Sequence, residues 1–435
     1  MASVDPYLWA VFAETPQALR AGGRLAMLKT RSTVAMAMLV AGSIVTSCSS
    51  SKREAPVSTA PLKTVPASPA TAMSEPAIRV AIAKTQTLVN LTAGAGGALL
   101  SDRSGREFGR LQPYQALTVR AGTGSLQVAT PSGNSVCSGC VDAKGTAPIT
   151  FNNSPLGRRV TVWADANGTL TVVAWIEIEE YLMGVLAGEV PYQRWAPEAL
   201  KAQAIVSRSY ALHQMKMRAA EPYDVETTEA SQVFRMGHTE EPILQAAIDA
   251  TRGQVLTCGG RLFPAYFHST CGGATTAAER VFPDRASSPA LCGAPCAFCR
   301  HSPSYQWSWQ VDKTELGRRL GLGQPVLGLE AVTDPSGRAE SVRVRYAGGE
   351  RIFPGNAFRL AVGSRELKSL WWSQVGDGGT FLRFEGRGFG HGVGMCQYGS
   401  DGMARAGRSC GEIVRHYFPG SELTTLYGAT TTAAR

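Results

Sequence analysis

Apolar and polar positions alternate with a period of two where the chain first offers a core. Ile78, Val80 and Ile82 alternate with less apolar neighbours, which is the pattern of a β-strand with one buried face. Further β-like segments are ALTVRA (116–121), SLQVAT (125–130), RRVTVWA (158–164) and TLTVVAWIEI (169–178), separated by breaks such as NNSPLG and DANG. Residues 78–178 are therefore predicted to be mainly β.

The period changes to that of a helix near Tyr181, and apolar residues keep helical spacing as far as Leu212. Two prolines interrupt this run. Pro191 cannot continue a helix, whereas Pro197 suits a first helical turn. The pattern predicts a helix, a short corner and a second helix, with Glu189 at the corner.

Glycines mark the turns farther along the chain. Gly259 and Gly260 separate two apolar segments and predict a hairpin. The segment GRGFGHGVGMCQYGSDGMARAG (386–407) has six glycines from Gly386 to Gly399, too many for a regular element, and helix is expected from Met403. The predicted fold class is α+β: a β-rich amino-terminal part leads into a helical core with further strands and a Gly-rich loop.

Composition is typical of a protein outside the cytoplasm and narrows the classes of partner. Charged residues make up 18% of the 435 residues and glycine accounts for 47, which suits a loop-rich extracytoplasmic protein of two to three domains. A formal charge of +9 either favours an anionic partner or simply aids solubility. Nucleic acid is not expected as a partner, because the sequence has no basic run interleaved with aromatic residues.

Residues 1–48 are predicted to be a signal segment. Lys29 and Arg31 precede an apolar run, Val34–Val45, that is too short to span a bilayer. The run leads into Val-Thr-Ser-Cys48, which resembles a bacterial lipobox with Cys48 as the lipidated residue; the alternative is an ordinary signal peptide with an incidental cysteine. Residues 49–77 have five prolines and no aromatic residue, so they are predicted to be a linker.

The stretch Ile176–Leu212 carries the leading candidates for chemistry. Glu189 stands alone before the corner, whereas Glu177, Glu179 and Glu180 cluster at the start of the first helix and are interpreted as solvated or helix-start charges. Ser207 and Arg208 lie on the helix that leaves the corner, which suggests a role in positioning a substrate. In the Gly-rich loop, His391 stands between two glycines and is expected to be exposed and able to donate to a ligand.

Six of the ten cysteines fall into two groups. The later group has the spacing C-x3-C-x2-C after an earlier cysteine, and its members are Cys271, Cys292, Cys296 and Cys299. These four could hold zinc tetrahedrally, or His268 or His301 could replace one of them. A full cysteine set leaves no open position for water, so the zinc would be structural; two disulfides are the competing interpretation. Cys137 and Cys140 are expected to be a local disulfide or two free thiols.

Four segments in order resemble the SpoIID/LytB family, the stage II sporulation D proteins and amidase enhancers of bacterial cell walls. They are EEYLMGVLAGEVP, PEALKAQAIVSRSYAL, YFHSTCGGAT and GRGFGHGVGMCQYGSDGMA, followed by HYFPG. The resemblance covers roughly residues 78–427, within which residues 179–427 would be the catalytic core and 428–435 a tail. Some members bind zinc through Cys and His residues near the FHS motif, but the full ligand set does not transfer.

The resemblance implies a peptidoglycan substrate and lytic transglycosylase activity on glycan strands that lack stem peptides. Glu189 matches the family's catalytic glutamate. The residues expected to bind substrate are Ser207, Arg208, Tyr210, His268, Ser269, His391 and Gln397. The expected partners are glycan strands, a membrane reached through the lipid anchor, and a cell-wall amidase.

A single glutamate is sufficient for the expected reaction. Hydrolytic glycosidases generally use two carboxyl groups, whereas the C6 hydroxyl of the muramoyl residue is an internal nucleophile. Glu189 would protonate the glycosidic oxygen, then accept the proton of that hydroxyl, leaving 1,6-anhydro-muramoyl ends. For this it should be partly desolvated, with Leu186, Val190 and Trp195 as walls. The rival hypotheses are a non-catalytic wall-binding enhancer of an amidase and, more weakly, a zinc-dependent wall hydrolase.

Overall fold

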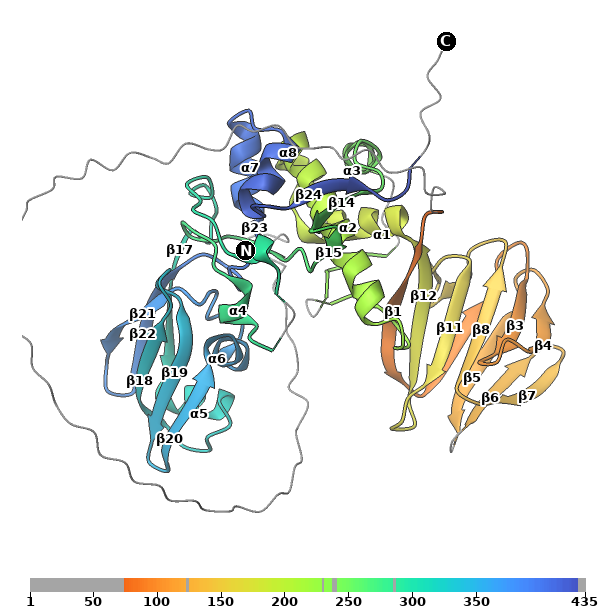
Figure 1. Ribbon diagram of the computed structural model, residues 1–435. Coiled ribbons are helices and arrows are strands. Elements are labelled where there is room, and N and C mark those ends of the chain that lie inside the picture. Colours follow the sequence, from red (N-terminus) through yellow and green to blue (C-terminus); the bar gives the residue numbers. More distant parts are fainter. Residues whose placement is uncertain (1–73, 123–124, 229–230, 237–240, 285–286, 429–435) are drawn as a thin grey trace, which may run out of the picture. The chain divides into compact units, whose positions relative to one another are not determined.

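The computed structural model describes residues 74–122, 125–228, 231–236, 241–284 and 287–428 (Figure 1). The predicted signal segment with Cys48 lies outside these residues, as do the linker up to residue 73 and the tail from residue 429. Among the described residues, no helix is both long enough and apolar enough to cross a membrane.

Two sheets make up the amino-terminal part. The strands of the first are β1 (Ala77–Gln86), β3 (Ala98–Asp102), β4 (Glu107–Leu111), β8 (Cys140–Gly145), β11 (Arg159–Ala164), β12 (Leu170–Glu177) and β13 (Val225–Glu226). Those of the second are β2 (Leu88–Thr92), β5 (Ala116–Gly122), β6 (Ser125–Thr130), β7 (Gly133–Cys137), β9 (Thr150–Phe151) and β10 (Ser154–Pro155). The spatial orders are β13–β1–β12–β11–β8–β3–β4 and β10–β9–β2–β5–β6–β7. The predicted strands are confirmed as β1, β5, β6, β11 and β12.

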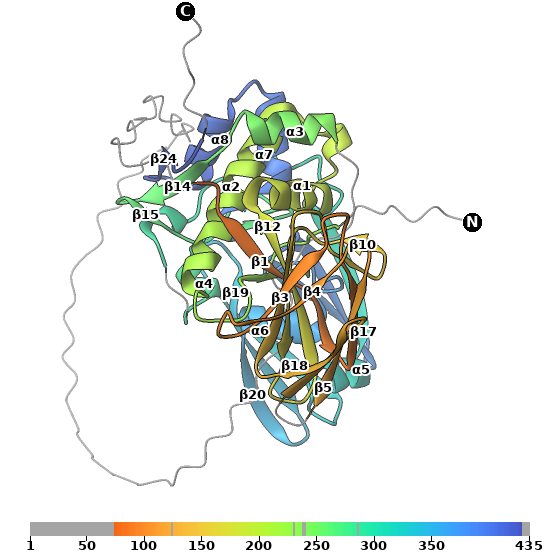
Figure 2. The same cartoon turned by 90° about the vertical axis from the view of Figure 1, so that its right-hand side faces the viewer.

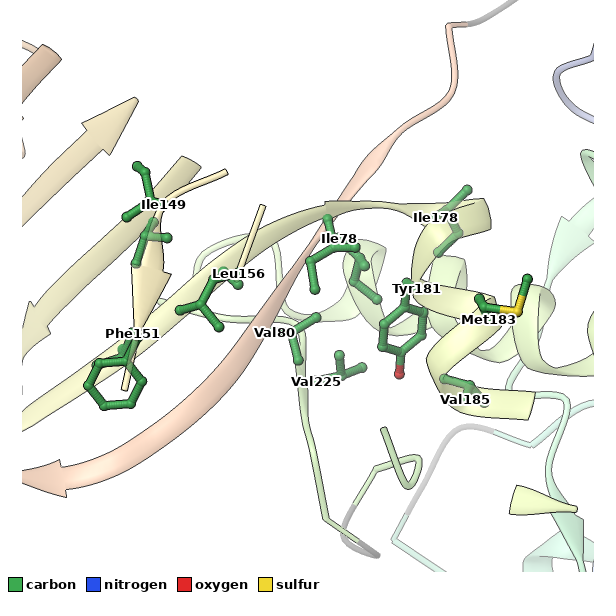
Figure 3. Packing of buried hydrophobic residues seen from close by; sticks show 14 of the residues in the cluster. Ile78, Val80, Ile149, Phe151, Leu156, Ile178, Tyr181, Met183, Val185 and Val225 are labelled. Carbon is green, nitrogen blue, oxygen red and sulfur yellow. The ribbon is translucent and has the colours of Figure 1, made fainter. Parts of the chain in front are cut away.

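The alternating pattern of β1 buries one face of the strand against the first helix. Ile78 and Val80 are fully buried, and Val80 pairs in parallel with Val225 of β13. Figure 3 shows these side chains together with Tyr181 of helix α1 (Ile178–Glu189). Since Val225 follows the helices in sequence, the β part and the helical part share this core.

Helix α2 (Pro197–Met217) is the element around which the other helices pack. It contacts α1, α3 (Pro242–Asp249), α7 (Gln397–Arg405) and α8 (Cys410–Tyr417), which surround it in Figures 1 and 2. Ala199, Ala202 and Ala204 of α2 are fully buried, so small side chains allow the close packing that the sequence suggests. The corner between α1 and α2 contains the short 3₁₀ helix η1 (Tyr192–Arg194).

Two small sheets flank these helices. One has the order β15–β14–β24, from β14 (Gln254–Cys258), β15 (Arg261–Leu262) and β24 (Glu422–Thr425). The predicted hairpin is confirmed, because Gly259 and Gly260 join β14 to β15 with φ angles of 55° and 71°, the geometry that glycine adopts without strain. The other pairs β16 (Phe267–His268) in parallel with β23 (Met395–Cys396). Helix α4 (Ala278–Val281) and 3₁₀ helix η2 (Pro289–Leu291) lie in the intervening chain.

Residues 306–387 form a β-rich region with a hydrophobic core of its own, which the sequence pattern did not single out. Its elements are β17 (Gln306–Asp312), α5 (Lys313–Arg319), β18 (Val326–Thr333), β19 (Ala339–Tyr346), β20 (Gly349–Pro354), α6 (Gly355–Val362), β21 (Trp372–Asp377) and β22 (Phe381–Arg387). They build the sheets β17–β22–β21 and β18–β19–β20. Val342, Phe358 and Phe384 are buried in this core.

Helix α7 begins at Gln397, six residues before the position expected for it. The glycines that argued against a regular element instead permit close packing. A Cβ on Gly399 would lie 2.0 Å from the Tyr417 hydroxyl, and one on Gly402 would lie 2.1 Å from Phe298 O. Cys396 caps the helix, since its Sγ accepts from Gly399 N–H at 3.3 Å.

Candidate functional site

Glu189 is the last residue of α1 and has a defined pose. Its residue is 7% exposed, and Val233 N–H donates to its Oε1 at 2.8 Å. The helix stops here because Pro191 cannot extend it, and the extended Val190 turns the chain toward η1. The predicted corner is therefore confirmed, with its carboxyl group largely removed from water.

Two glycines on α1 let residues 231–236 approach the helix closely enough to hold Glu189. A Cβ on Gly184 would lie 2.4 Å from Phe234 Cε2, and one on Gly188 would lie 2.6 Å from Val233 O. Phe234 also stacks on Tyr181, with ring centroids 5.2 Å apart. The sequence analysis missed this contact. The signal was available in the i, i+4 spacing of the two glycines, which leaves one face of a helix without side chains.

The corner that follows Glu189 is tied to α7, the helix that follows the Gly-rich loop. Trp195 meets Tyr398 edge-on, with ring centroids 5.8 Å apart. Ala196 N–H donates to Asp401 Oδ1 at 3.0 Å, and Arg405 Nε donates to Asp401 Oδ2 at 2.6 Å. Two segments far apart in the sequence therefore meet at the corner.

Arg208 is an internal ion-pair partner rather than a substrate contact. Its side chain is 0% exposed, and its Nε and Nη2 donate to Oε1 and Oε2 of Glu179 at 3.0 and 2.6 Å. Glu179 lies in the first turn of α1, one of the two alternatives expected for it, but at 6% exposure it is not solvated, whereas Glu177 and Glu180 are exposed. A guanidinium that is fully enclosed cannot meet a glycan while the fold is intact.

The other substrate candidates on α2 are also buried. Ser207 is 0% exposed and its Oγ accepts from Gln203 Nε2 at 3.0 Å. Tyr210 is 2% exposed and its hydroxyl accepts from Gln214 Nε2 at 2.8 Å. Both hydroxyls and the ring of Tyr210 are part of the buried packing of α2, so neither side chain reaches a substrate directly.

His391 is buried, at 2% exposure, and the expectation that it is exposed is wrong. The glycines on either side adopt φ angles of 113° and 84°, which turn the ring inward. There it packs against Tyr266, Phe282 and His268, with centroid distances of 5.9, 5.3 and 5.5 Å. Val393 N–H donates to His391 Nδ1 at 3.0 Å.

His268 also bonds to the backbone of Val393, through its carbonyl oxygen, and is uncharged at neutral pH. Its Nδ1 lies 3.0 Å from Val393 O and donates to it, which leaves Nε2 with a lone pair. Burial lowers the pKa of His268 to about 3, since an imidazolium ion is costly away from water. Of the two remaining candidates, Gln397 is buried, while Ser269 is half-buried and its carbonyl accepts from Tyr398 N–H at 3.0 Å.

Three of the four predicted zinc ligands lie together in the structure, and the fourth position is taken by another cysteine. The ligand atoms of Cys271, Cys296, Cys299 and Cys396 all lie within 4.8 Å of one another. Cys292 is exposed and outside this group, so its predicted place belongs to Cys396. His301 is directed elsewhere: its Nε2 lies 3.1 Å from Asp401 Oδ2.

Cys137 and Cys140 are both free thiols in this structure, one of the two alternatives expected for them. Cys137 ends β7 and Cys140 begins β8. Burial raises the pKa of Cys140 to about 11. This thiol is therefore protonated and unreactive at neutral pH.

Sequence comparison with known proteins matches the segment around the corner and a larger part of the chain. The family model described as SpoIID, stage II sporulation protein, matches residues 166–258, which include Glu189, α1 and α2. The chain is 30% identical to stage II sporulation protein D of Bacillus subtilis over 291 residues, 63% of this chain and 81% of that protein. It is 32% identical to an uncharacterized protein of Brachyspira hyodysenteriae over 266 residues, 59% of this chain and 69% of that one. The amidase enhancer of Bacillus subtilis is 26% identical over 297 residues, 56% of this chain and 40% of that protein.

Proposed function

Since the chain belongs to the SpoIID/LytB family, we propose that it is a lytic transglycosylase of peptidoglycan with Glu189 as its acid and base. The observation that carries the proposal is the pose of this carboxyl group. It ends a helix at a corner, is largely buried, and accepts a backbone N–H from Val233. Its substrate would be glycan strands that lack stem peptides.

The environment of Glu189 suits a residue that must act in both protonation states. Burial disfavours the charged form, whereas a backbone N–H donor stabilises the carboxylate. The protonated group would donate to the glycosidic oxygen as the bond to it breaks. The carboxylate would then remove the proton from the muramoyl C6 hydroxyl, whose oxygen closes the 1,6-anhydro ring.

Two acids on segments that meet at the corner are held by other side chains, which favours a mechanism that uses one carboxyl group. Glu241 accepts from the Tyr192 hydroxyl at 2.9 Å, and Asp401 accepts from Arg405. Hydrolytic glycosidases generally need a second carboxyl group beside the first. A lytic transglycosylase does not, because its substrate supplies the nucleophile.

The second candidate is a non-catalytic module that binds peptidoglycan and stimulates an N-acetylmuramoyl-L-alanine amidase. It is favoured by the similarity to a protein named amidase enhancer. In this case the corner would position a glycan for the partner enzyme, and the Glu189 carboxyl would not transfer a proton.

The experiment incubates purified residues 49–435 with denuded glycan strands and measures anhydro-muramoyl ends by mass spectrometry. We expect Glu189→Gln to lower their formation at least about a hundredfold, because the amide cannot transfer the proton. Glu180→Gln is the matched control: Glu180 is exposed on the same helix, so this variant should retain activity. Circular dichroism checks that both variants are folded.

Two outcomes would contradict the enzyme proposal. One is a folded Glu189→Gln variant that is as active as the wild type. The other is a wild type that forms no anhydro ends but binds glycan and raises the activity of an added amidase, which would establish the enhancer function instead.

The amino-terminal segment supports a membrane anchor at Cys48, outside the described residues. A lipidated Cys48 followed by the linker would hold the wall-acting part outside the cytoplasm within reach of the membrane. We expect the full-length protein to enter the detergent phase in detergent partitioning, and Cys48→Ala to enter the aqueous phase. A Cys48→Ala variant that partitions like the wild type would rule out this anchor.

A further inference from the structure

Four cysteines from distant parts of the chain meet in the core beside the Gly-rich loop. Cys271 follows β16, Cys296 and Cys299 lie after η2, and Cys396 ends β23. Their exposed fractions are 1%, 3%, 0% and 0%, and their sulfur atoms all lie within 4.8 Å of one another. Four thiols without a shared ligand have no reason to lie this close together, so the cluster indicates a common partner.

The sulfur spacing suits a metal ion better than disulfide bonds. Zinc–sulfur bonds of about 2.3 Å in a tetrahedron place the sulfur atoms about 3.8 Å apart. Cys271 Sγ and Cys299 Sγ are 3.5 Å apart, close to that edge and far from the roughly 2.05 Å of a disulfide. Each sulfur has the other three as neighbours, as in a tetrahedral site.

Backbone N–H groups point at these sulfurs in the way that outer-sphere donors stabilise metal-bound thiolates. Cys396 Sγ accepts from Cys271 N–H at 3.2 Å and from Gly399 N–H at 3.3 Å. Gly273 N–H donates to Cys271 Sγ at 3.5 Å, and the Tyr417 hydroxyl lies 3.1 Å from Cys296 Sγ.

The charges of the pocket also suit a bound dication. A dication that replaces the thiol protons allows all four buried sulfurs to bind as thiolates. The buried guanidinium of Arg338 donates to Cys271 O at 2.7 Å and would offset the remaining negative charge.

We propose that Cys271, Cys296, Cys299 and Cys396 bind one zinc ion as a structural tetrathiolate site. Thiolates are soft ligands that select zinc, and four of them leave no position for water or substrate. The ion joins the β16 loop, the C-x2-C loop and the start of α7. It thereby fixes the segment that carries His391 and the helix that contacts the corner. The site is independent of the proposed function, since it would hold the same loops in an enhancer.

The test measures metal in full-length protein extracted in detergent under non-reducing conditions. Plasma mass spectrometry should find about one zinc ion per chain. Cys396→Ser should lower the zinc content at least about tenfold, since it removes a ligand. Cys292→Ser is the matched control, because Cys292 is in the same loop region but outside the cluster, and it should keep its zinc.

X-ray absorption at the zinc edge of the wild type provides a readout that needs no variant to fold. Four sulfur neighbours at about 2.3 Å are expected, and a nitrogen neighbour would show that a histidine is a ligand and overturn the assignment. Mass spectra of unreduced peptides that join these cysteines as two disulfides would overturn it as well. So would bound iron in place of zinc, or zinc that survives Cys396→Ser and is lost in Cys292→Ser.

Discussion

Glu179 and Glu189 lie at opposite ends of helix α1, and their carboxyl groups have different surroundings. Glu179 is surrounded by donors: Arg208 binds both of its oxygens, and the Tyr427 hydroxyl and Gly253 N–H donate to Oε1 at 2.8 and 3.2 Å. These contacts join the start of α1 to α2 and to the end of the described chain. Glu189 accepts the backbone N–H of Val233 at 2.8 Å, which sets the direction of its carboxyl group at the corner.

Replacing Arg208 by methionine should destabilise the protein strongly. It would leave Glu179 buried without its counter-ion, which costs about 3–5 kcal/mol, and would also remove the donor to Gln254 O at 3.0 Å. The measurement is urea unfolding followed by circular dichroism. Glycan binding by the fraction that remains folded should be unchanged, because Arg208 does not reach the surface.

The matched control is Arg318→Met, which removes an arginine from an exposed pair with Glu315. Its unfolding midpoint should equal that of the wild type within error, because exposed ion pairs contribute little. A stable Arg208→Met protein with weakened glycan binding would contradict this prediction and show that Arg208 contacts the substrate.

Helix α1 depends on residues that lack side chains as much as on those that have them. Glycine normally weakens a helix by about 1 kcal/mol relative to alanine. Gly184 and Gly188 nevertheless occupy successive turns of α1, facing Phe234 and Val233. Their role is to admit the segment that donates to Glu189.

Gly188→Ala should therefore destabilise the protein, although the same change would strengthen an isolated helix. The new Cβ would lie 2.6 Å from Val233 O, and such overpacking costs about 1–3 kcal/mol. Moving Val233 would also displace the N–H that holds Glu189, so formation of anhydro ends should fall more than stability alone explains. Urea unfolding and the glycan assay measure the two effects.

Gly109→Ala in β4 is the control for adding a methyl group where there is room. Its Cβ would come no closer than 3.6 Å to Leu100 Cδ1, which is ordinary contact, so activity should be retained. If Gly188→Ala were more stable than the wild type and fully active, the segment 231–236 would not hold Glu189 in place.

Local pattern predicted the elements whose burial is local. The alternation in β1, the two prolines around the corner and the paired glycines of the β14–β15 hairpin each act within a few residues. The same reasoning misjudged the start of α7. Its glycines are needed because Tyr417 and Phe298 pack too close to leave room for a side chain, and they do not interrupt the helix. It also missed the separate core of residues 306–387, since which strands share a core depends on pairing across the sheet.

The candidate functional residues show the same contrast between features set by neighbours in the sequence and features set by remote contacts. The position of Glu189 at a helix end was predicted correctly because a proline follows shortly after it. Cys396 was missed and His391 was misjudged because their partners are remote: Cys396 meets Cys271, and His391 packs on Tyr266. The burial of Glu179 was missed for the same reason, since its counter-ion is Arg208 on the next helix. Spacing in sequence favoured Cys292, whereas convergence in space selects Cys396.

At the scale of the whole molecule, Arg79 joins the β part to the helices. It lies on β1, and its guanidinium donates to Asp224 Oδ1 at 2.5 Å, to Glu221 O at 2.6 Å and to Arg218 O at 2.8 Å. Arg218 caps the end of α2. The Arg79 side chain therefore binds both the end of that helix and the chain that leads into β13. Asp224 is 2% exposed, which makes its counter-ion hard to replace.

Arg79→Met should consequently loosen both parts at once. Hydrogen exchange followed by mass spectrometry should accelerate in β1 and β12, and equally in the end of α2 and in β13, because the unpaired Asp224 must either reach water or become protonated. Arg158→Met is the control; Arg158 is exposed just before β11, and its loss should leave exchange unchanged. Faster exchange confined to β1 would mean that the two parts hold together without Arg79. Faster exchange on both sides would show that the sheet leading into α1 and the helix leaving the corner are stabilised as one unit, so that the pose of Glu189 depends on both.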